Sequence, residues 1–310
     1  MLRLRFPFFS ILFIHLLLLQ SCMPDPPPPK RLNYQNIIIL SDLSDRVDSL
    51  INGTQLNGQY PPKDLKQIEE LLQFFRNECV KPGEKIDDMS SVAFTTFSRN
   101  DMIAAIDIGK FDDLYEKQQF VNSKGVYRNK GLDNEIKKFN ADVKKIYMNE
   151  RNQGLDLISI LIDKIENKLD IKQNVVQTTG VDSVFKNFEN HIYIFTDGYL
   201  EYQGKKLNSQ YYFGVNEIGR IRDYCKQNDV DISTALKNDK SLGLPKAFSR
   251  KNHLITLHVV ETDSRDYDNK KLTYRHGLTF SDNSILKAVW RNWAIESGFK
   301  DFKWNEYPQK

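Results

Sequence analysis

The 310-residue sequence has few cysteines and almost no excess of charge of either sign. Lysine and arginine number 44 against 41 aspartates and glutamates, a balance that gives no indication of nucleic-acid binding or of a polybasic membrane patch. Cys22, Cys79 and Cys225 are the three cysteines. Cys79 and Cys225 lie near the ends of predicted helices, and their spacing leaves open either a disulfide or two buried free thiols.

Several motifs that are typical of enzymes are also missing. The sequence contains no glycine-rich phosphate loop and no nucleophile elbow. Beyond residue 21 the histidines are His191, His253, His258 and His276, and none of them forms a zinc-type pair. His253 and His258 are expected on opposite sides of one strand. We therefore expect solvated or core histidines and a protein that is not an enzyme.

The most informative stretch is an aliphatic run followed by small polar residues. Residues 37–40 are all aliphatic, too few for a helix, and Asp42 and Ser44 follow them. This pattern predicts a buried strand of a parallel sheet with Asp42 and Ser44 at its carboxyl end, where open α/β sheets bind ligands. Residues 191–198 repeat the design with an apolar strand and Asp197. Two such strands side by side would bring Asp42 and Asp197 together.

Residues 1–21 have the composition of an export signal. Two arginines precede an almost unbroken apolar run that is shorter than the roughly twenty apolar residues of a membrane span. Residues 19–22, Leu-Gln-Ser-Cys, resemble a bacterial lipobox, in which the cysteine becomes the lipidated first residue of a lipoprotein. We therefore expect attachment to a membrane through lipidated Cys22, in the bacterial cell envelope. An ordinary cleaved signal or an uncut hydrophobic anchor is the alternative.

A proline-rich segment separates Cys22 from the rest of the chain. Residues 24–29 contain five prolines, which favour an extended polyproline II conformation of about 3.1 Å per residue. Residues 22–34 are therefore expected to form a stiff tether, and residues 35–310 a single domain with an insertion around residues 109–150.

Apolar periodicity predicts helices alternating with strands. Strands are expected at residues 36–41, 91–97, 104–108, 191–196 and 253–261, and helices at residues 62–80, 136–147, 155–169, 215–227 and 282–296. Residues 171–190 are ambiguous, and residues 199–213 are expected to form a loop or hairpin turning at Gly204. This alternation predicts an α/β fold with a mainly parallel central sheet and helices on both faces.

The two aspartate motifs and the tryptophan-bearing final helix carry a family resemblance. The chain resembles a von Willebrand factor A domain over residues 36–298. Residues 37–46 correspond to the first strand and loop of that domain, and residues 192–198 to its fourth strand. In that family an Asp-x-Ser-x-Ser motif, a later threonine and an aspartate after the fourth strand form a metal-ion-dependent adhesion site. The resemblance implies a Rossmann-like fold and a Mg²⁺ site formed by Asp42, Ser44 and Asp197.

Two positions depart from the family pattern. The third motif position holds Arg46, whose guanidinium offers no ligand atom. Asn152 stands nearest to the expected threonine, with Thr95 and Thr96 as alternatives earlier in the chain. If Arg46 is folded away, Mg²⁺ could bind through the remaining oxygens; if it points inward, it would pair with an aspartate and replace the ion.

The sequence thus predicts an envelope-anchored lipoprotein whose von Willebrand factor A-like domain binds a protein partner. The alternatives are a metal-dependent, phosphoesterase-like hydrolase and a non-catalytic assembly component without metal. Haloacid-dehalogenase phosphatases also keep a nucleophilic aspartate after the first strand, but the second aspartate of their motif is Ser44 in this chain.

Overall fold

The computed structural model describes residues 30–44, 62–83, 88–152, 154–179, 182–202, 210–261, 265–268 and 270–306. The chain divides into two compact units, which are described separately below: unit 1 comprises residues 1–32 and 174–187, and unit 2 comprises residues 33–173 and 188–310. Cys22, Arg46 and Gly204 lie outside the described residues. No helix among the described residues is long and apolar enough to cross a membrane.

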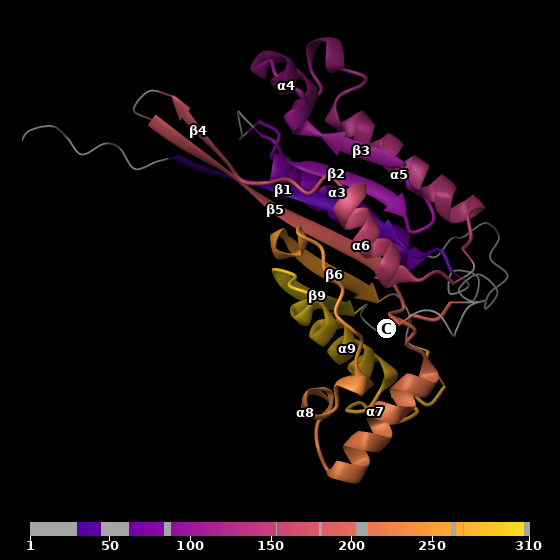
Figure 1. The fold of residues 1–310 in the computed structure, drawn as a ribbon. Coiled ribbons are helices and arrows are strands. Elements are labelled where there is room, and N and C mark those ends of the chain that lie inside the picture. The colour runs from indigo at the N-terminus through magenta and orange to yellow at the C-terminus, as the bar shows by residue number, and fades with distance from the viewer. Residues whose placement is uncertain are drawn as a thin grey trace, which may run out of the picture. The chain divides into compact units, whose positions relative to one another are not determined.

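Unit 2 is built on a mainly parallel sheet with the strand order β3-β2-β1-β5-β6-β9 (Figure 1). The strands are β1 (Lys30–Ser41), β2 (Ser91–Thr96), β3 (Ala104–Asp107), β5 (Asp182–Thr196), β6 (Ile255–Glu261) and β9 (Asp301–Glu306). β2 runs parallel to β1, and β5, β6 and β9 run parallel to one another, whereas β3 pairs antiparallel with β2. The predicted α/β class with a mainly parallel sheet is therefore confirmed.

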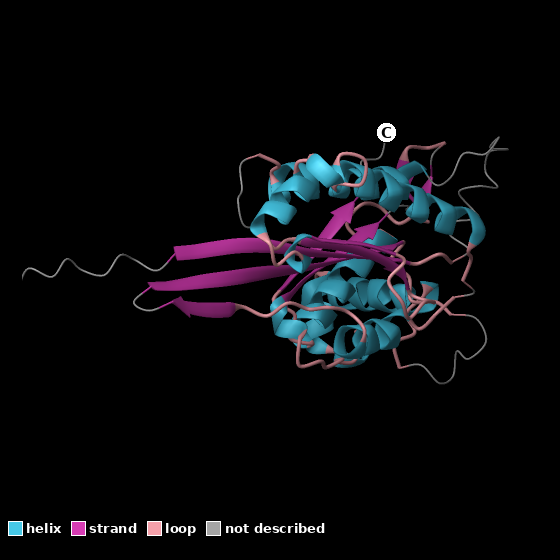
Figure 2. Ribbon diagram, turned by 90° about the horizontal axis from the view of Figure 1, so that it is seen from above, coloured by secondary structure: helices cyan, strands magenta, loops and turns pink. Residues whose placement is uncertain are grey.

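Helices lie on both faces of this sheet (Figure 2). The helices are α3 (Pro62–Phe74), continued by a π-helical turn (Phe75–Val80), α4 (Leu114–Val121), α5 (Leu132–Asn149), α6 (Leu157–Asn167), α7 (Val215–Asn228), α8 (Ile232–Asn238) and α9 (Asp282–Glu296). Short 3₁₀ turns span Ile108–Lys110, Gly125–Tyr127, Lys240–Leu242 and Asn252–Leu254. The predicted helices are all present; α4 and α8 were not predicted.

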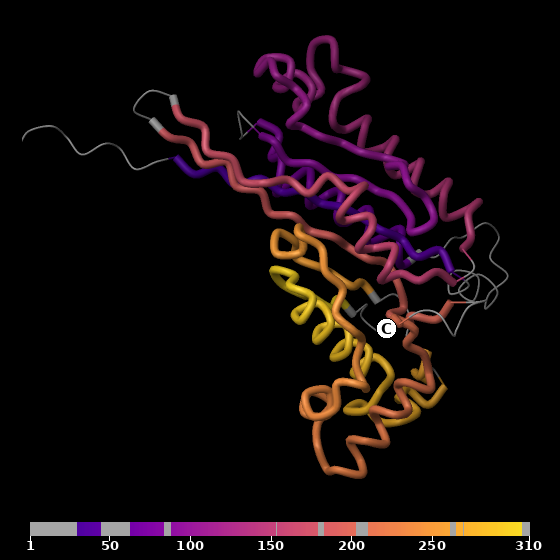
Figure 3. Tube along the Cα trace, in the orientation of Figure 1, coloured from indigo at the N-terminus to yellow at the C-terminus, as the bar shows by residue number. Residues whose placement is uncertain are grey.

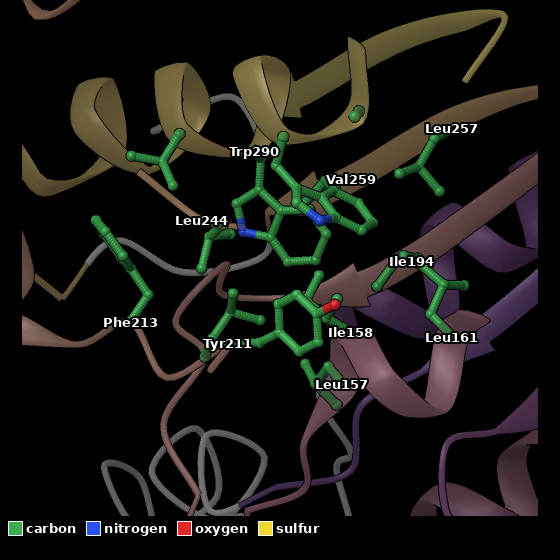
Figure 4. Packing of buried hydrophobic residues seen from close by; sticks show 14 of the residues in the cluster. Leu157, Ile158, Leu161, Ile194, Tyr211, Phe213, Leu244, Leu257, Val259 and Trp290 are labelled. Carbon is green, nitrogen blue, oxygen red and sulfur yellow. The ribbon is translucent and has the colours of Figure 1, made fainter. Parts of the chain in front are cut away.

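The aliphatic run of β1 explains why both faces are covered. Ile37 and Ile39 belong to one core cluster, with α3 and α5, whereas Ile38 and Leu40 belong to the other, with α6, α7 and α9. Alternate residues of a strand point to opposite faces, so a continuous aliphatic run suits a central strand buried on both sides. In the second cluster, the ring of Trp290 points from α9 toward Tyr211 (Figure 4).

The two cysteines of unit 2 lie in different cores. Cys79 packs in the cluster with α3 and α5, Cys225 packs in the cluster on the other face, and both are free thiols. A sheet separates the two clusters, so the alternative of two buried free thiols holds and the disulfide does not.

One predicted strand begins later than expected, and one strand was not predicted. The predicted strand at residues 253–261 begins at Ile255, because His253 belongs to a 3₁₀ turn. β9 was not predicted, although Phe302 and Trp304 alternate with polar residues in the two-residue period of a strand. β9 pairs with β6 and extends the sheet beyond the predicted strands.

Unit 1 contains a β-hairpin in the stretch that the sequence left ambiguous. β4 (Val175–Thr179) pairs antiparallel with the first residues of β5, from Val175 opposite Lys186 to Thr179 opposite Asp182. The guanidinium of Arg31 lies 5.0 Å from the ring centre of Phe185. The sequence left this stretch ambiguous because Val175–Thr179, Val-Val-Gln-Thr-Thr, shows neither the two-residue alternation of a half-buried strand nor the period of a helix.

Candidate functional site

The candidate site lies between β1 and β5, where the order in which the chain adds strands to the sheet of unit 2 reverses. From β1 the chain proceeds through β2 and β3 on one side, and from β5 it proceeds through β6 and β9 on the other. Asn36 Nδ2 donates to Asn190 Oδ1 at 2.8 Å in the middle of both strands, and Asp42 N donates to Phe195 O at 2.9 Å at their carboxyl ends, so β1 and β5 run in the same direction. The carboxyl ends of β1 and β5 therefore form a topological switch point, the usual ligand site of open α/β sheets.

Asp42 lies at this switch point and is only 4 % exposed. Its Oδ1 accepts the Ser44 amide at 3.1 Å, and its Oδ2 accepts the hydroxyls of Ser44 at 3.1 Å and Thr196 at 3.3 Å. The carboxylate thus fixes the loop that follows β1 and links it to the end of β5. The structure brings Asp42 and Ser44 into direct contact, as the sequence predicts.

Asp197 follows β5 and pairs with Arg265, which no sequence motif indicates. Its Oδ2 lies 2.6 Å from both Nε and Nη2 of Arg265, and its Oδ1 accepts the Tyr199 amide at 3.2 Å. Arg265 Nη1 donates to Glu201 at 2.6 Å, and the guanidinium lies 4.0 Å from the ring centre of Tyr199. Arg265 is thus held by two carboxylates and one aromatic face.

The charge of Arg265 is stabilised by these neighbours. Burial alone lowers the pKa of the guanidinium, but the carboxylates of Asp197 and Glu201 outweigh it and raise the pKa above its ordinary value. Two carboxylates share one guanidinium, so these three groups together carry one net negative charge. Because Asp197 is 2 % exposed, it depends on this partner more than a surface carboxylate would.

A second buried network joins Tyr199 to the first turn of α9. Tyr199 donates its hydroxyl to Asp282 Oδ2 at 2.5 Å, and Arg222 of α7 donates to Asp282 Oδ1 at 2.6 Å. The Asp282 amide donates to Asp266 Oδ2 at 2.8 Å. Burial, followed by the hydrogen bond to Asp282, raises the pKa of Tyr199, so its hydroxyl stays protonated and keeps donating. These contacts connect the segment of Arg265 and Asp266 to the rigid core.

Gly198 sets the path of the chain behind Asp197. Its φ of +84° lies in the left-handed region, and a Cβ at this position would come within 2.7 Å of the Trp304 ring. Trp290 Nε1 donates to the Gly198 carbonyl at 2.8 Å. The tryptophan of the final helix, which contributed to the family resemblance, thus holds the turn after β5 in place.

Asn152 lies beside the loop of Asp42. Its backbone amide donates to the Leu43 carbonyl at 2.7 Å, and its side chain is only 6 % exposed. Asn152 Nδ2 is buried and has no hydrogen-bond partner among the described residues. The structure therefore places Asn152 next to the predicted site, whereas its part in binding a metal stays a prediction.

The two threonines that served as alternatives are engaged elsewhere. Thr95 Oγ1 donates to the Asp101 carbonyl at 2.8 Å, and Thr96 Oγ1 shares a hydrogen bond with Ser98 Oγ at 3.0 Å. Both contacts stabilise the turn between β2 and β3. Asn152 consequently remains the stronger candidate for the position of the family's threonine.

The described residues fit an arginine at this site better than a directly bound Mg²⁺. The guanidinium of Arg265 already lies 2.6 Å from Asp197 Oδ2, so a second cation on that oxygen would be repelled at short range. Among the described residues no three His, Cys, Asp or Glu side chains gather closely enough to hold a metal. Mg²⁺ binding through Asp42, Ser44, Asn152 and Asp197 stays a prediction, and Arg46 lies outside the described residues.

A histidine pair lies away from this site, on the face of the sheet that packs against α3. His191 Nδ1 and His258 Nε2 are 3.0 Å apart across β5 and β6, and Tyr193 stacks on His258 with ring centres 4.1 Å apart. Burial, then the charges of His191 and Lys303, lower the pKa of His258 to about 3. The sequence does not indicate this pair, because His191 and His258 become diagonal neighbours only through the register that places Tyr193 opposite His258.

No protein-family model and no curated protein matches the chain. Among solved structures, the chain is similar to proximal thread matrix protein 1 from the mussel byssus, with 10 % sequence identity and a TM-score of 0.23. The match covers 84 % of this chain and 49 % of the mussel chain, so this chain spans about half of that protein's length. The site must therefore be interpreted from its own geometry.

Proposed function

We propose that the protein is an envelope-anchored lipoprotein whose von Willebrand factor A-like domain binds another protein at the carboxyl edge of its sheet. One observation carries this proposal: the charged cluster of Asp42, Asp197 and Arg265 lies at the topological switch point of the sheet. The family resemblance and the lipobox supply the expected fold type and the expected anchor.

The surroundings of the cluster support a protein partner. Arg265 is followed by a two-stranded ribbon, β7 (Tyr267–Asp268) and β8 (Thr273–Tyr274). Leu272 between these strands is 71 % exposed, and Leu278 shortly after them is 72 % exposed. Exposed leucines in the segment that follows Arg265 resemble the anatomy of a protein interface, in which apolar contacts surround a few fixed polar groups.

In this proposal Arg265 takes the place that a metal ion holds in the family. A metal would present one positive charge centre to a partner's carboxylate, whereas Arg265 is already shared by Asp197 and Glu201. Asp197, Glu201 and Arg265 together carry one net negative charge. This group therefore favours a basic side chain of the partner over an acidic one.

The proposal is tested by capturing partners with the lipidated protein from its own envelope. Native protein and the Arg265→Gln and Asp197→Asn variants are compared, with Arg291→Gln as the control because Arg291 is an exposed arginine of α9. We expect one partner to be recovered with native protein and the control and reduced at least fivefold with both site variants. Equal recovery with all four proteins would contradict a binding site at this edge.

The hydrolase alternative concerns Asp42. Both of its carboxylate oxygens accept hydrogen bonds, from Ser44 and Thr196, and nothing in the described site favours a nucleophilic role for it. A screen of generic phosphoesters with native protein and the Asp42→Ala variant separates the classes. We expect no turnover by either protein; turnover that disappears in the variant would favour the hydrolase.

A further inference from the structure

Phe248 is the most exposed large apolar side chain of the described chain, at 79 %. It lies in the loop before β6, between Ala247 and Ser249, which are 5 % and 4 % exposed. An aromatic side chain that points into water between two buried neighbours cannot be explained by a need for core packing.

The loop holds Phe248 outward because both neighbours are anchored. The Ala247 amide donates to Ser297 Oγ at 3.0 Å, and Asn252 Nδ2 donates to the Ala247 carbonyl at 3.2 Å. Ser249 Oγ donates to Glu166 Oε2 at 2.5 Å. Figure 3 shows this orange loop beside the yellow turn that follows α9. With both flanking residues fixed, Phe248 cannot turn inward without breaking these hydrogen bonds.

The charge around Phe248 is locally positive, although the whole chain is nearly neutral. Residues 245–254 contain Lys246, Arg250 and Lys251 and no acidic residue. Lys251 Nζ donates to the Glu166 carbonyl at 2.9 Å, and the Glu166 carboxylate already accepts the Ser249 hydroxyl. An exposed aromatic ring flanked by lysine and arginine is typical of surfaces that contact the interface of an anionic membrane.

The loop also lies at the amino edge of the sheet of unit 2, the edge at which its strands begin. β6 begins at Ile255, which lies opposite Asn190 of β5. Asn190 accepts a hydrogen bond from Asn36 of β1, which lies three residues after the start of unit 2. Asn33 is the first residue of unit 2, and 11 peptide steps separate it from Cys22. This segment therefore spans at most about 40 Å. If Cys22 is lipidated, this edge stays close to the bilayer, so a weak contact is strengthened by a high local concentration.

We infer that Phe248, with Lys246 and Arg250, forms a second membrane contact that inserts into an anionic lipid surface. This inference rests on the proposed anchoring through Cys22. The contact orients unit 2 with the amino edge of its sheet on the membrane. The carboxyl edge, with Asp42, Asp197 and Arg265, then faces away from the membrane toward a partner.

The test places a tryptophan at position 248 of the full-length, lipidated protein in vesicles. The Phe248→Trp variant is compared with Leu278→Trp, because Leu278 is 72 % exposed and lies close to the N-terminus of α9, at the carboxyl edge. Native protein supplies the background emission of its own tryptophans. Vesicles contain brominated phosphatidylcholine, either alone or mixed with an equal part of phosphatidylglycerol.

We expect the emission of the tryptophan at position 248 to shift to shorter wavelength and to be quenched when phosphatidylglycerol is present, and that of position 278 to remain unchanged. Adding Lys246→Gln and Arg250→Gln to Phe248→Trp should weaken the contact roughly 25-fold, because each basic residue contributes about fivefold. Equal emission at positions 248 and 278, or quenching at position 278 alone, would overturn the inference.

Flotation of the same vesicles separates this inference from the proposed anchor. If native protein does not float and the Cys22→Ser variant behaves identically, the anchoring proposal fails and the membrane contact fails with it. If native protein floats but position 248 is not quenched, only the membrane contact fails. If Phe248→Ser removes a captured protein and position 248 is not quenched, the surface binds protein instead, and the inference is wrong.

Discussion

Replacing Arg265 should expose how strongly the site depends on one guanidinium. Arg265→Gln removes both contacts to Asp197 and the contact to Glu201 and leaves the Asp197 carboxylate, 3 % exposed, without its cation. Breaking a fully buried pair costs about 3–5 kcal/mol, but the Arg265 side chain is 41 % exposed and water screens part of the loss. We therefore expect a loss of about 1–2 kcal/mol in the free energy of unfolding.

Thermal and urea unfolding of native protein, Arg265→Gln and the control Arg291→Gln measure this loss. For a domain of this size, about 1–2 kcal/mol corresponds to a melting temperature lower by roughly 4 °C. Combining Arg265→Gln with Asp197→Asn should recover part of the loss, because the uncompensated carboxylate is then absent. Unfolding of Arg265→Gln that matches Arg291→Gln would refute the argument that the ion pair organises the site.

Three further predictions concern other parts of the chain. His258 stays neutral in the folded protein down to about pH 3, but it protonates near pH 6.5 in the unfolded chain. The free energy of unfolding should therefore fall as the pH drops from about 6.5 toward 3, by up to about 1.4 kcal/mol per pH unit. Urea titrations at several pH values should show a shallower dependence of this free energy on pH for His258→Phe. Gly198→Ala should lower the free energy of unfolding by about 2–4 kcal/mol, because its Cβ would meet the Trp304 ring. Gly219→Ala in α7 should raise this free energy by up to about 1 kcal/mol, because its Cβ would meet no atom within 4 Å. Urea unfolding of both variants measures the two changes. Arg46→Ser should raise the affinity for Mg²⁺ if Arg46 excludes the ion. Isothermal titration that shows no heat with native protein or with the variant would contradict the metal hypothesis.

The sequence predicted the parts of the fold that depend on local pattern. The aliphatic run of β1, the apolar face of α5 and the helix α9 all follow from the period of their apolar residues. β9 was missed although Phe302 and Trp304 alternate with polar residues, because six residues after a long helix give a weak signal. The β4–β5 hairpin was ambiguous because its pairing is set by a partner strand.

The candidate site was predictable only in part for a similar reason. Asp42, Ser44 and Asp197 follow apolar strands directly, so their sequence position indicates the carboxyl edge. Arg265 lies in a polar loop that offers several charged residues of both signs. Only the folded chain shows which of them reaches Asp197. The sequence did anticipate that an arginine could replace a metal ion, but it assigned that role to Arg46.

The central claim is that the carboxyl edge of the sheet is the surface that binds a partner. The most direct measurement introduces a photo-crosslinking amino acid at Leu278, beside the candidate site, and at Phe248, at the amino edge, in protein anchored in its own envelope. Our account predicts one protein adduct from position 278, its loss in the Arg265→Gln background, and no protein adduct from position 248. The same protein adduct from position 248, or an adduct from position 278 that Arg265→Gln leaves unchanged, would contradict it.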